Sequence, residues 1–221
     1  MIFKPSPNFA PRESRVDHLV LHYTGMKTAQ AAIDLLCSPA AEVSAHYVVD
    51  EDGAITQLVH EHHRAWHAGI SSWRGKSGLN DASIGIEIVN PGHEWGYRAF
   101  PEPQIQAVIG LCHGILSRHP IPAHNIVAHS DIAPNRKRDP GELFPWPRLA
   151  ASGIGLWTEA FAPPGDLRAD LKAIGYDTSL PEHDVILAFQ RHFLPTTLTG
   201  HPAPQTRARA AALRARLTQA P

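Results

Sequence analysis

The segment that best indicates the fold and chemistry of this chain is Ala128-His129-Ser130-Asp131-Ile132-Ala133-Pro134-Asn135-Arg136-Lys137-Arg138-Asp139-Pro140-Gly141. His129 follows a short apolar run at 125–128 that is typical of a strand. Asp139 comes ten residues later, directly before a Pro-Gly turn signal. The pattern predicts a strand and then a stiff loop that brings the aspartate back beside the histidine. An imidazole and a carboxylate held together are two of the ligands that zinc prefers in proteins.

The composition is that of an ordinary globular chain, with 221 residues of which 43% are hydrophobic. This length fits one full domain and a small one. A formal net charge of -1 argues against a nucleic-acid or polyanion partner. No apolar run reaches the roughly 18 residues of a membrane-spanning helix, and residues 1–7 lack a signal-peptide core. These features predict a cytoplasmic protein, or a periplasmic or outer-membrane-associated one if a signal segment has been removed. Cys37 and Cys112 lie in helical patterns and are expected to be free thiols.

A third metal ligand is expected at the end of an earlier strand. Residues 16–23 are mostly apolar and precede Thr24-Gly25, which predicts a central strand that ends in a turn. His22 then lies at the carboxyl end of a buried strand, where α/β folds place ligands. Taken alone, His22 could equally be a core histidine bonded to a carbonyl. With His129 and Asp139 it completes three ligands and leaves a fourth position for water, as in catalytic zinc sites.

Glu87 is the candidate general base of the same site. It lies at the centre of an otherwise apolar strand pattern at 84–90, where a carboxylate costs several kcal/mol unless it is paired or faces a wet site. A core salt bridge is one interpretation, and a base with a raised proton affinity is the other. Lys137, two residues before Asp139, can face the same centre and stabilise an oxyanion. Together these groups predict hydrolysis of an amide or ester.

The remaining patterns predict an α/β chain with two domains. Strands are expected at 44–50 and 54–59, joined as a hairpin, and helices at 28–37 and 102–118. A linker composition at 158–166 precedes three helical patterns, at 167–174, 182–193 and 206–217. We therefore expect a catalytic domain at 1–162 and a small three-helix domain at 163–221, whose core is marginal alone and leans on the larger domain.

Six further side chains are candidates for substrate contacts, because they lie in loops or at strand ends near these elements. They are His46, Trp66, His67, Trp73, Arg74 and Asn90. The loop composition of residues 70–83 predicts a functional or mobile segment. The run His60-Glu61-His62-His63 looks like a metal site, yet no partner ligand follows at a familiar zinc spacing. A solvated strand end or loop is the expectation for that run.

Several separated motifs resemble the zinc-dependent N-acetylmuramoyl-L-alanine amidases of the type-2 family, of the AmiD and AmpD kind, whose fold peptidoglycan-recognition proteins share. The motifs, which follow the family's order between about residues 5 and 150, are Leu21–Gly25, Ser44–Tyr47, Ala65–Gly69, Ile84–Glu87 and His129–Gly141. The resemblance implies a central mixed β-sheet flanked by helices, one zinc ion, and cleavage between the lactyl group of N-acetylmuramic acid and L-alanine. By motif it places the zinc ligands on His22, His129 and Asp139. The catalytic glutamate falls on Glu87 and the oxyanion lysine on Lys137.

The C-terminal part resembles the small helical peptidoglycan-binding domains that are fused to such amidases, on the basis of 188–193, 199–200 and 205–207. The resemblance implies peptidoglycan or a muropeptide, including its anhydro form, as the partner; a monomer is favoured. Two alternatives stay open. One is a binder of wall fragments that does no chemistry and can do without the metal. The other is a zinc hydrolase that acts on a different amide.

Overall fold

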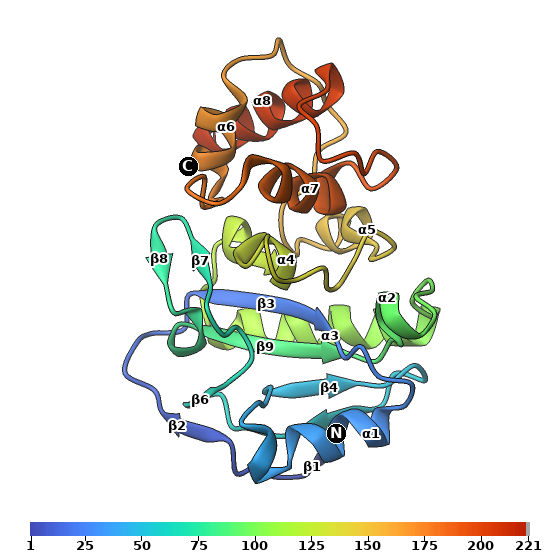
Figure 1. The fold of residues 1–221 in the computed structure, drawn as a ribbon. Coiled ribbons are helices and arrows are strands. Elements are labelled where there is room, and N and C mark those ends of the chain that lie inside the picture. Colours follow the sequence, from blue (N-terminus) through green and yellow to red (C-terminus); the bar gives the residue numbers. More distant parts are fainter. Residues whose placement is uncertain (220–221) are drawn as a thin grey trace.

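A computed structural model describes residues 1–219, and its centre is a six-stranded mixed sheet in the order β1-β5-β4-β9-β3-β10 (Figure 1). The strands are β1 (Ile2–Phe3), β3 (His18–Tyr23), β4 (Tyr47–Val49), β5 (Ile55–Gln57), β9 (Ser83–Ile88) and β10 (Ile126–Ala128). Only β4 and β5 pair antiparallel, as the expected hairpin, and the other neighbours are parallel. The central mixed sheet flanked by helices is therefore confirmed.

The alternation of side chains in β3 and β9 decides which groups can meet. Leu19 and Leu21 of β3, and Ile86 of β9, belong to the buried cluster that includes α3. His22 and Glu87 therefore project from the opposite face, because successive residues of a strand point to opposite sides. The two strands are neighbours, so the sheet presents both side chains on one surface.

Helices cover both faces of the sheet. α3 (Glu102–Arg118) has the bounds that its apolar periodicity predicts, and it packs Ile105, Val108 and Ile115 into the main core. α1 (Ala29–Leu36) lies on the other face (Figure 1), and Leu36 joins a smaller cluster with Val48. The hydroxyl of Thr28 caps α1 by accepting from Ala31 N at 3.2 Å. A short helix, α2 (Gly92–Trp95), follows β9.

The segment expected as a long loop at 70–83 contains regular structure. It forms a hairpin of β7 (Ser72–Trp73) and β8 (Lys76–Ser77) and then a 3-10 turn at Leu79–Asp81. Arg74 and Gly75 are the two turn residues, with φ values of 50° and 79°. Two-residue hairpin turns of type I′ require a positive φ at both positions. A second small pair joins β2 (Phe9–Pro11) to β6 (His63–Ala65).

The C-terminal helices share a core with the rest of the chain. After α4 (His129–Ile132) and α5 (Trp146–Ala151), the chain forms α6 (Leu167–Ile174), α7 (Glu182–Phe193) and α8 (Pro204–Gln219), which stack beyond α4 and α5 in Figure 1. One buried cluster joins residues of β3, β7, β10 and α4 to residues of all three C-terminal helices, among them Val20, Trp73, Val127, Ile132, Leu171, Phe189 and Leu213. The helices of the unit expected at 163–221, whose last two residues lie outside the described range, therefore pack into a cluster that they share with β3, β7, β10 and α4.

A buried carboxyl group joins the two parts. Asp131, in α4, is 0% exposed and accepts from Ala128 N at 2.8 Å and from His192 Nδ1 at 2.7 Å. Its other oxygen accepts from the hydroxyl of Tyr176 at 2.6 Å, and burial, then the nearby Asp131, raises the pKa of that phenol. The residue two places after His129 is thereby bonded to two segments of the C-terminal unit.

Replacing Tyr176 with phenylalanine is expected to lower the free energy of unfolding by about 1–3 kcal/mol, because it leaves a fully buried carboxyl oxygen without its donor. Chemical denaturation of both proteins measures the difference. Because the core is shared, we also expect one cooperative transition. An unchanged midpoint, or separate transitions for the two parts of the wild-type chain, would contradict this description.

Two expectations from the composition can be checked directly. Cys37 and Cys112 are both free thiols, as expected. Within residues 1–219, no helix combines the length and the apolar character that crossing a membrane requires.

Candidate active site and metal centre

Three side chains converge at the carboxyl ends of β3 and β10. His22 is the fifth residue of β3, His129 begins α4 directly after β10, and Asp139 returns from the following loop. His22 Nδ1 lies 2.9 Å from His129 Nδ1 and 3.1 Å from Asp139 Oδ2, and His129 Nδ1 lies 2.9 Å from that same oxygen. The three residues are 1%, 4% and 7% exposed. The structure therefore brings together the three ligands that the sequence predicts.

These atoms fit a single metal ion. Ligand atoms bound to one tetrahedral zinc at about 2.0–2.2 Å lie roughly 3.3 Å apart, close to the separations observed. Within residues 1–219, this is the one group of at least three His, Cys, Asp or Glu side chains whose ligand atoms lie within 4.8 Å of one another. Two imidazole nitrogens and a carboxylate oxygen are also a donor set that suits zinc.

Local structure explains how Asp139 reaches the histidines. The expected strand and loop prove to be a strand, the single-turn helix α4 and a returning segment, with Ser130 N donating to Asp139 O at 2.9 Å. Gly141 follows at a φ of 88°, and a Cβ there would lie 2.2 Å from Tyr97 Oη. That hydroxyl donates to Pro140 O at 2.9 Å. Only glycine fits this position without displacing the tyrosine.

Burial and neighbouring groups together set the charge states of two members of the cluster. Burial first, and then His129, lower the pKa of His22 to about 4, so His22 is neutral and able to bind a metal at pH 7. Burial alone would raise the pKa of Asp139. An imidazole that carries a proton toward Asp139, His129 first and then His22, outweighs that effect and lowers the pKa of this carboxyl group, so Asp139 is a carboxylate.

Glu87 lies next to His22 because the parallel register of β3 and β9 pairs these two residues directly. Its Oε2 is buried and has no hydrogen-bond partner among the described residues. Burial, with a contribution from Asp139, raises the pKa of Glu87 well above its ordinary value, and Lys137 opposes the shift. A core salt bridge, the alternative interpretation, is absent from residues 1–219, where no ion pair involves Glu87.

An open cavity of about 530 Å³ gives access to these groups. Glu87, His129, Lys137 and Asp139 line it, so the candidate base, two ligands and the candidate oxyanion lysine share one space. Its other walls are of two kinds. One wall is apolar and comes from α1 and its surroundings: Ala32, Leu35, Leu36 and Val43. The other wall consists of charged or aromatic side chains, which include Tyr23, Trp66, His93, Arg136 and Arg138.

Two of the six substrate candidates, Trp66 and His67, line this cavity. The His67 ring is 8% exposed and lies behind His22, with Nδ1 at 3.0 Å from His22 Nε2. Burial, with His22 next, holds the pKa of His67 well below its usual value, so the ring is neutral.

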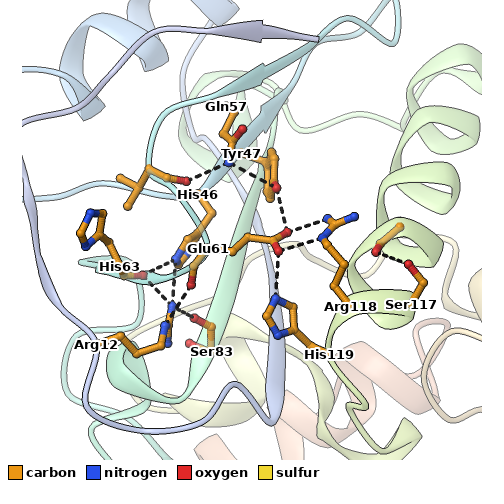
Figure 2. Close-up of polar contacts among 12 residues, drawn as sticks. Arg12, His46, Tyr47, Gln57, Glu61, His63, Ser83, Ser117, Arg118 and His119 are labelled. Carbon is orange, nitrogen blue, oxygen red and sulfur yellow. Dashed lines mark hydrogen bonds and ion pairs between the residues drawn. The ribbon is translucent and has the colours of Figure 1, made fainter.

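His46 does not line the cavity. Its Nδ1 accepts from Gly85 N at 3.0 Å. Its Nε2 donates to His63 O at 3.1 Å, beside Arg12 (Figure 2). Burial, then the Arg12 guanidinium, lowers the pKa of His46 to about 3. Within the expected loop at 60–63, Glu61 bonds to Tyr47, Arg118 and His119 (Figure 2). These contacts join the turn before β6 to β4 and to the C-terminal end of α3.

Trp73, Arg74 and Asn90 also lie outside the cavity lining. Trp73 is 3% exposed, donates to His124 O at 2.8 Å and packs edge-on against Tyr176. The Arg74 guanidinium donates to Ile174 O at 2.9 Å, at the end of α6. Asn90 is 0% exposed and bonds to Gly92 N and Arg98 O. The structure thus gives these three residues packing and capping contacts.

Sequence reasoning missed the apolar wall from α1 and the guanidinium groups of Arg136 and Arg138 as parts of the site. A signal existed for the arginines, because they flank Lys137 in a basic trio directly before a ligand. None existed for α1, whose amphipathic pattern looks the same whether its exposed edge faces solvent or a cavity.

The chain is similar to known proteins over most of its length. The family model described as N-acetylmuramoyl-L-alanine amidase (Amidase_2) matches residues 12–142. The N-acetylmuramoyl-L-alanine amidase AmiD of Escherichia coli strain K12 is 41% identical over an alignment that covers 90% of this chain and 82% of AmiD.

Solved structures extend the similarity to the C-terminal helices. The complex of AmiD from E. coli with the substrate anhydro-N-acetylmuramic acid-L-Ala-D-γ-Glu-L-Lys has a TM-score of 0.81 and 39% identity, and covers 94% of this chain and 91% of that chain. AmpDh3 from Pseudomonas aeruginosa, in complex with an anhydromuramic pentapeptide, has a TM-score of 0.83 and 34% identity, and covers 94% of each chain. Coverage of this extent includes most of α6–α8. The chain belongs to the N-acetylmuramoyl-L-alanine amidase family.

Proposed function

We propose that this chain is a zinc-dependent amidase that hydrolyses the bond between N-acetylmuramic acid, or its anhydro form, and the L-alanine of the stem peptide, in the turnover or recycling of peptidoglycan. The observation that carries the proposal is the buried His22-His129-Asp139 cluster at an open cavity that Glu87 also lines, with Glu87 Oε2 lacking a hydrogen-bond partner among residues 1–219. The ligand present in the AmiD complex, an anhydro-N-acetylmuramic acid peptide, supports the substrate class. The test is release of a peptide that begins with L-alanine from a defined muropeptide.

His22, His129 and Asp139 would hold one zinc ion. When bound, zinc supplies Lewis-acid chemistry, because it polarises a carbonyl group and makes a water molecule more acidic. The protein contributes two imidazole nitrogens, one carboxylate oxygen and their burial, which excludes competing water. A binder of wall fragments needs none of these features, so the intact ligand set favours the enzyme over that alternative.

Glu87 is the proton carrier of the proposed reaction. Its carboxylate takes a proton from the attacking water as the new carbon–oxygen bond forms. The same carboxyl group then gives that proton to the leaving nitrogen as the carbon–nitrogen bond breaks. The raised pKa of Glu87 suits both steps, because a base with greater proton affinity accepts the proton more readily and still releases it to an amine.

Lys137 is placed to stabilise negative charge that develops on the carbonyl oxygen. Its side chain lines the cavity together with Glu87 and Asp139. Replacing Lys137 with methionine is expected to lower kcat by roughly 10²–10³-fold with a smaller change in KM, because the charge interaction strengthens only in the transition state. Steady-state kinetics on an anhydro-muropeptide measure both constants. A methionine variant whose kcat stays within a factor of two of the wild type would remove Lys137 from the mechanism.

The walls of the cavity suit the two halves of the substrate. The Arg138 side chain, which lines the cavity, would face a carboxylate of the stem peptide, since arginine pairs with carboxylates in planar geometry; Arg136 lines it as well, and its guanidinium donates to Ile70 O. Trp66 offers an aromatic edge to the sugar or the lactyl group. The wall-binding role of α6–α8, the monomeric state and the cytoplasmic location stay predictions.

A further inference from the structure

The segment His67-Ala68 contacts both histidine ligands on the side away from the ligand cluster. His22 Nε2 lies 3.0 Å from His67 Nδ1, and His129 Nε2 lies 3.3 Å from Ala68 O. Each imidazole thus has one nitrogen toward the ligand cluster and the other toward the same pair of residues. A ring nitrogen that donates its hydrogen outward leaves the other nitrogen free to bind a metal.

Hydrogen-bond chemistry determines the direction of every bond in the chain that ends at His22. The hydroxyl of Ser83 lies 2.6 Å from Leu79 O, a carbonyl oxygen that can only accept. The single hydrogen of Ser83 is therefore used, so its oxygen must accept from His67 Nε2 at 3.1 Å. A neutral imidazole carries one hydrogen, which leaves His67 Nδ1 as an acceptor for the Nε2–H of His22. His22 Nδ1 is then bare and faces His129 and Asp139.

The same logic applies to His129. Ala68 O can only accept, so His129 donates from Nε2 and leaves Nδ1 bare toward Asp139. The two acceptors, His67 Nδ1 and Ala68 O, therefore select the same tautomer for both histidines, with the lone pairs of both Nδ1 atoms directed at the cluster.

Two further features keep the segment in place. Asn80 Oδ1 accepts from both His67 N (3.0 Å) and Ala68 N (2.7 Å). Gly85, in β9, lies against the His67 ring, and a Cβ at Gly85 would come within 2.4 Å of the His67 Cγ atom. The absence of a side chain at Gly85 therefore leaves the space in β9 that the His67 ring occupies.

We propose that His67 and Ala68, held by Ser83, Asn80 and the space at Gly85, position the metal ligands by selecting the tautomer of both histidines. This inference rests on the proposed function, because it concerns the same metal site. It assigns His67 to the support of the metal, where the sequence alone suggested a contact with substrate.

The test measures zinc affinity by competition with a chromophoric chelator, using the full chain. His67→Leu removes the acceptor and keeps much of the side-chain volume, and it is expected to weaken zinc binding by about 10–100-fold. His67→Asn restores an acceptor oxygen close to the position of Nδ1 and is expected to recover most of that loss. Ser83→Ala keeps the His67 ring but no longer determines its tautomer, so it is expected to weaken binding less than His67→Leu does.

Ser6→Ala is the matched control, because Ser6 is a buried serine whose hydroxyl donates to Leu36 O at 2.5 Å, outside the cavity lining. Its zinc affinity should equal that of the wild type. Absorption spectra of the cobalt-substituted proteins should shift for His67→Leu and Ser83→Ala but not for Ser6→Ala. Circular dichroism reports whether each variant folds, and Ser83→Ala provides a milder second test.

The outcomes separate this inference from the proposed function. Wild-type protein that binds one zinc, with folded His67→Leu and Ser83→Ala variants of unchanged affinity, would overturn the inference alone. An equal loss in Ser6→Ala and His67→Asn would also overturn it, because the effect would then be general destabilisation. A wild-type chain without zinc affinity would overturn the proposed metal site and this inference together.

Discussion

Replacing Glu87 with glutamine is expected to lower turnover by roughly 10²–10⁴-fold while the protein still binds its metal. Glutamine keeps the size of the side chain but cannot accept a proton from water. The metal should be unaffected, because Glu87 is not one of the three converging ligands. Glu87 Oε2 has no hydrogen-bond partner among the described residues, so the substitution breaks no hydrogen bond at that atom. The measurements are kcat on an anhydro-muropeptide and the zinc content of the purified protein.

Glu51→Gln is a suitable control for that experiment. Glu51 pairs with the exposed Arg98 at the surface, where an ion pair contributes little to stability. The control should retain the wild-type rate. A Glu87→Gln protein with a near-normal rate and normal zinc content would contradict the assignment of Glu87 as the base.

Replacing Asp139 with alanine is expected to weaken zinc binding by more than roughly 100-fold and to abolish activity. Loss of a hydrogen-bond partner outside the ligand set costs up to about 100-fold, and loss of a ligand should cost more. Asp139 provides the only negative charge among the three ligands, and its Oδ2 lies within 3.1 Å of both imidazole Nδ1 atoms. Without it, only the two imidazole nitrogens remain to bind a divalent cation. Elemental analysis after dialysis measures the loss of zinc.

The matched control is Asp34→Ala, in which an exposed aspartate paired with Lys4 is removed from the surface of α1. That protein should retain its zinc and its rate. Full zinc occupancy and normal turnover in Asp139→Ala would show that the cluster does not hold the catalytic metal.

Elements with strong periodicity could be predicted closely from the sequence. The bounds of α3, α6 and α7 coincide with the apolar patterns, because each helix buries one stripe against a neighbour. The convergence of His22 and Asp139 was also predictable, since strand ends and stiff loops place such side chains at one edge of a sheet. The resemblance to the amidase family added the mixed sheet and the order of the motifs.

Features that depend on three-dimensional pairing were not predictable in the same way. The side-by-side position of His22 and Glu87 follows from the register of β3 and β9, which are distant in sequence. Trp73 and Arg74 had the composition of an exposed loop, but the hairpin at 72–77 packs against the C-terminal helices. That surface exists only once α6–α8 have joined the common core.

Buried polar residues posed the same difficulty. His46 and His67 lie in motifs near the site and Asn90 follows one, and the sequence cannot show whether such a side chain faces substrate or a backbone group. In the structure His46 and Asn90 bond to backbone atoms, and His67 bonds to a ligand. Their hydrogen-bond partners come from segments that no local pattern connects to them.

The most direct test of the central claim is mass spectrometry of a defined anhydro-muropeptide after incubation with the purified chain, with and without a chelator. We predict release of a free peptide that begins with L-alanine, loss of this release on chelation, and its recovery when zinc is added back. An intact muropeptide after incubation with zinc-loaded protein, or cleavage that persists in the chelator, would contradict the account.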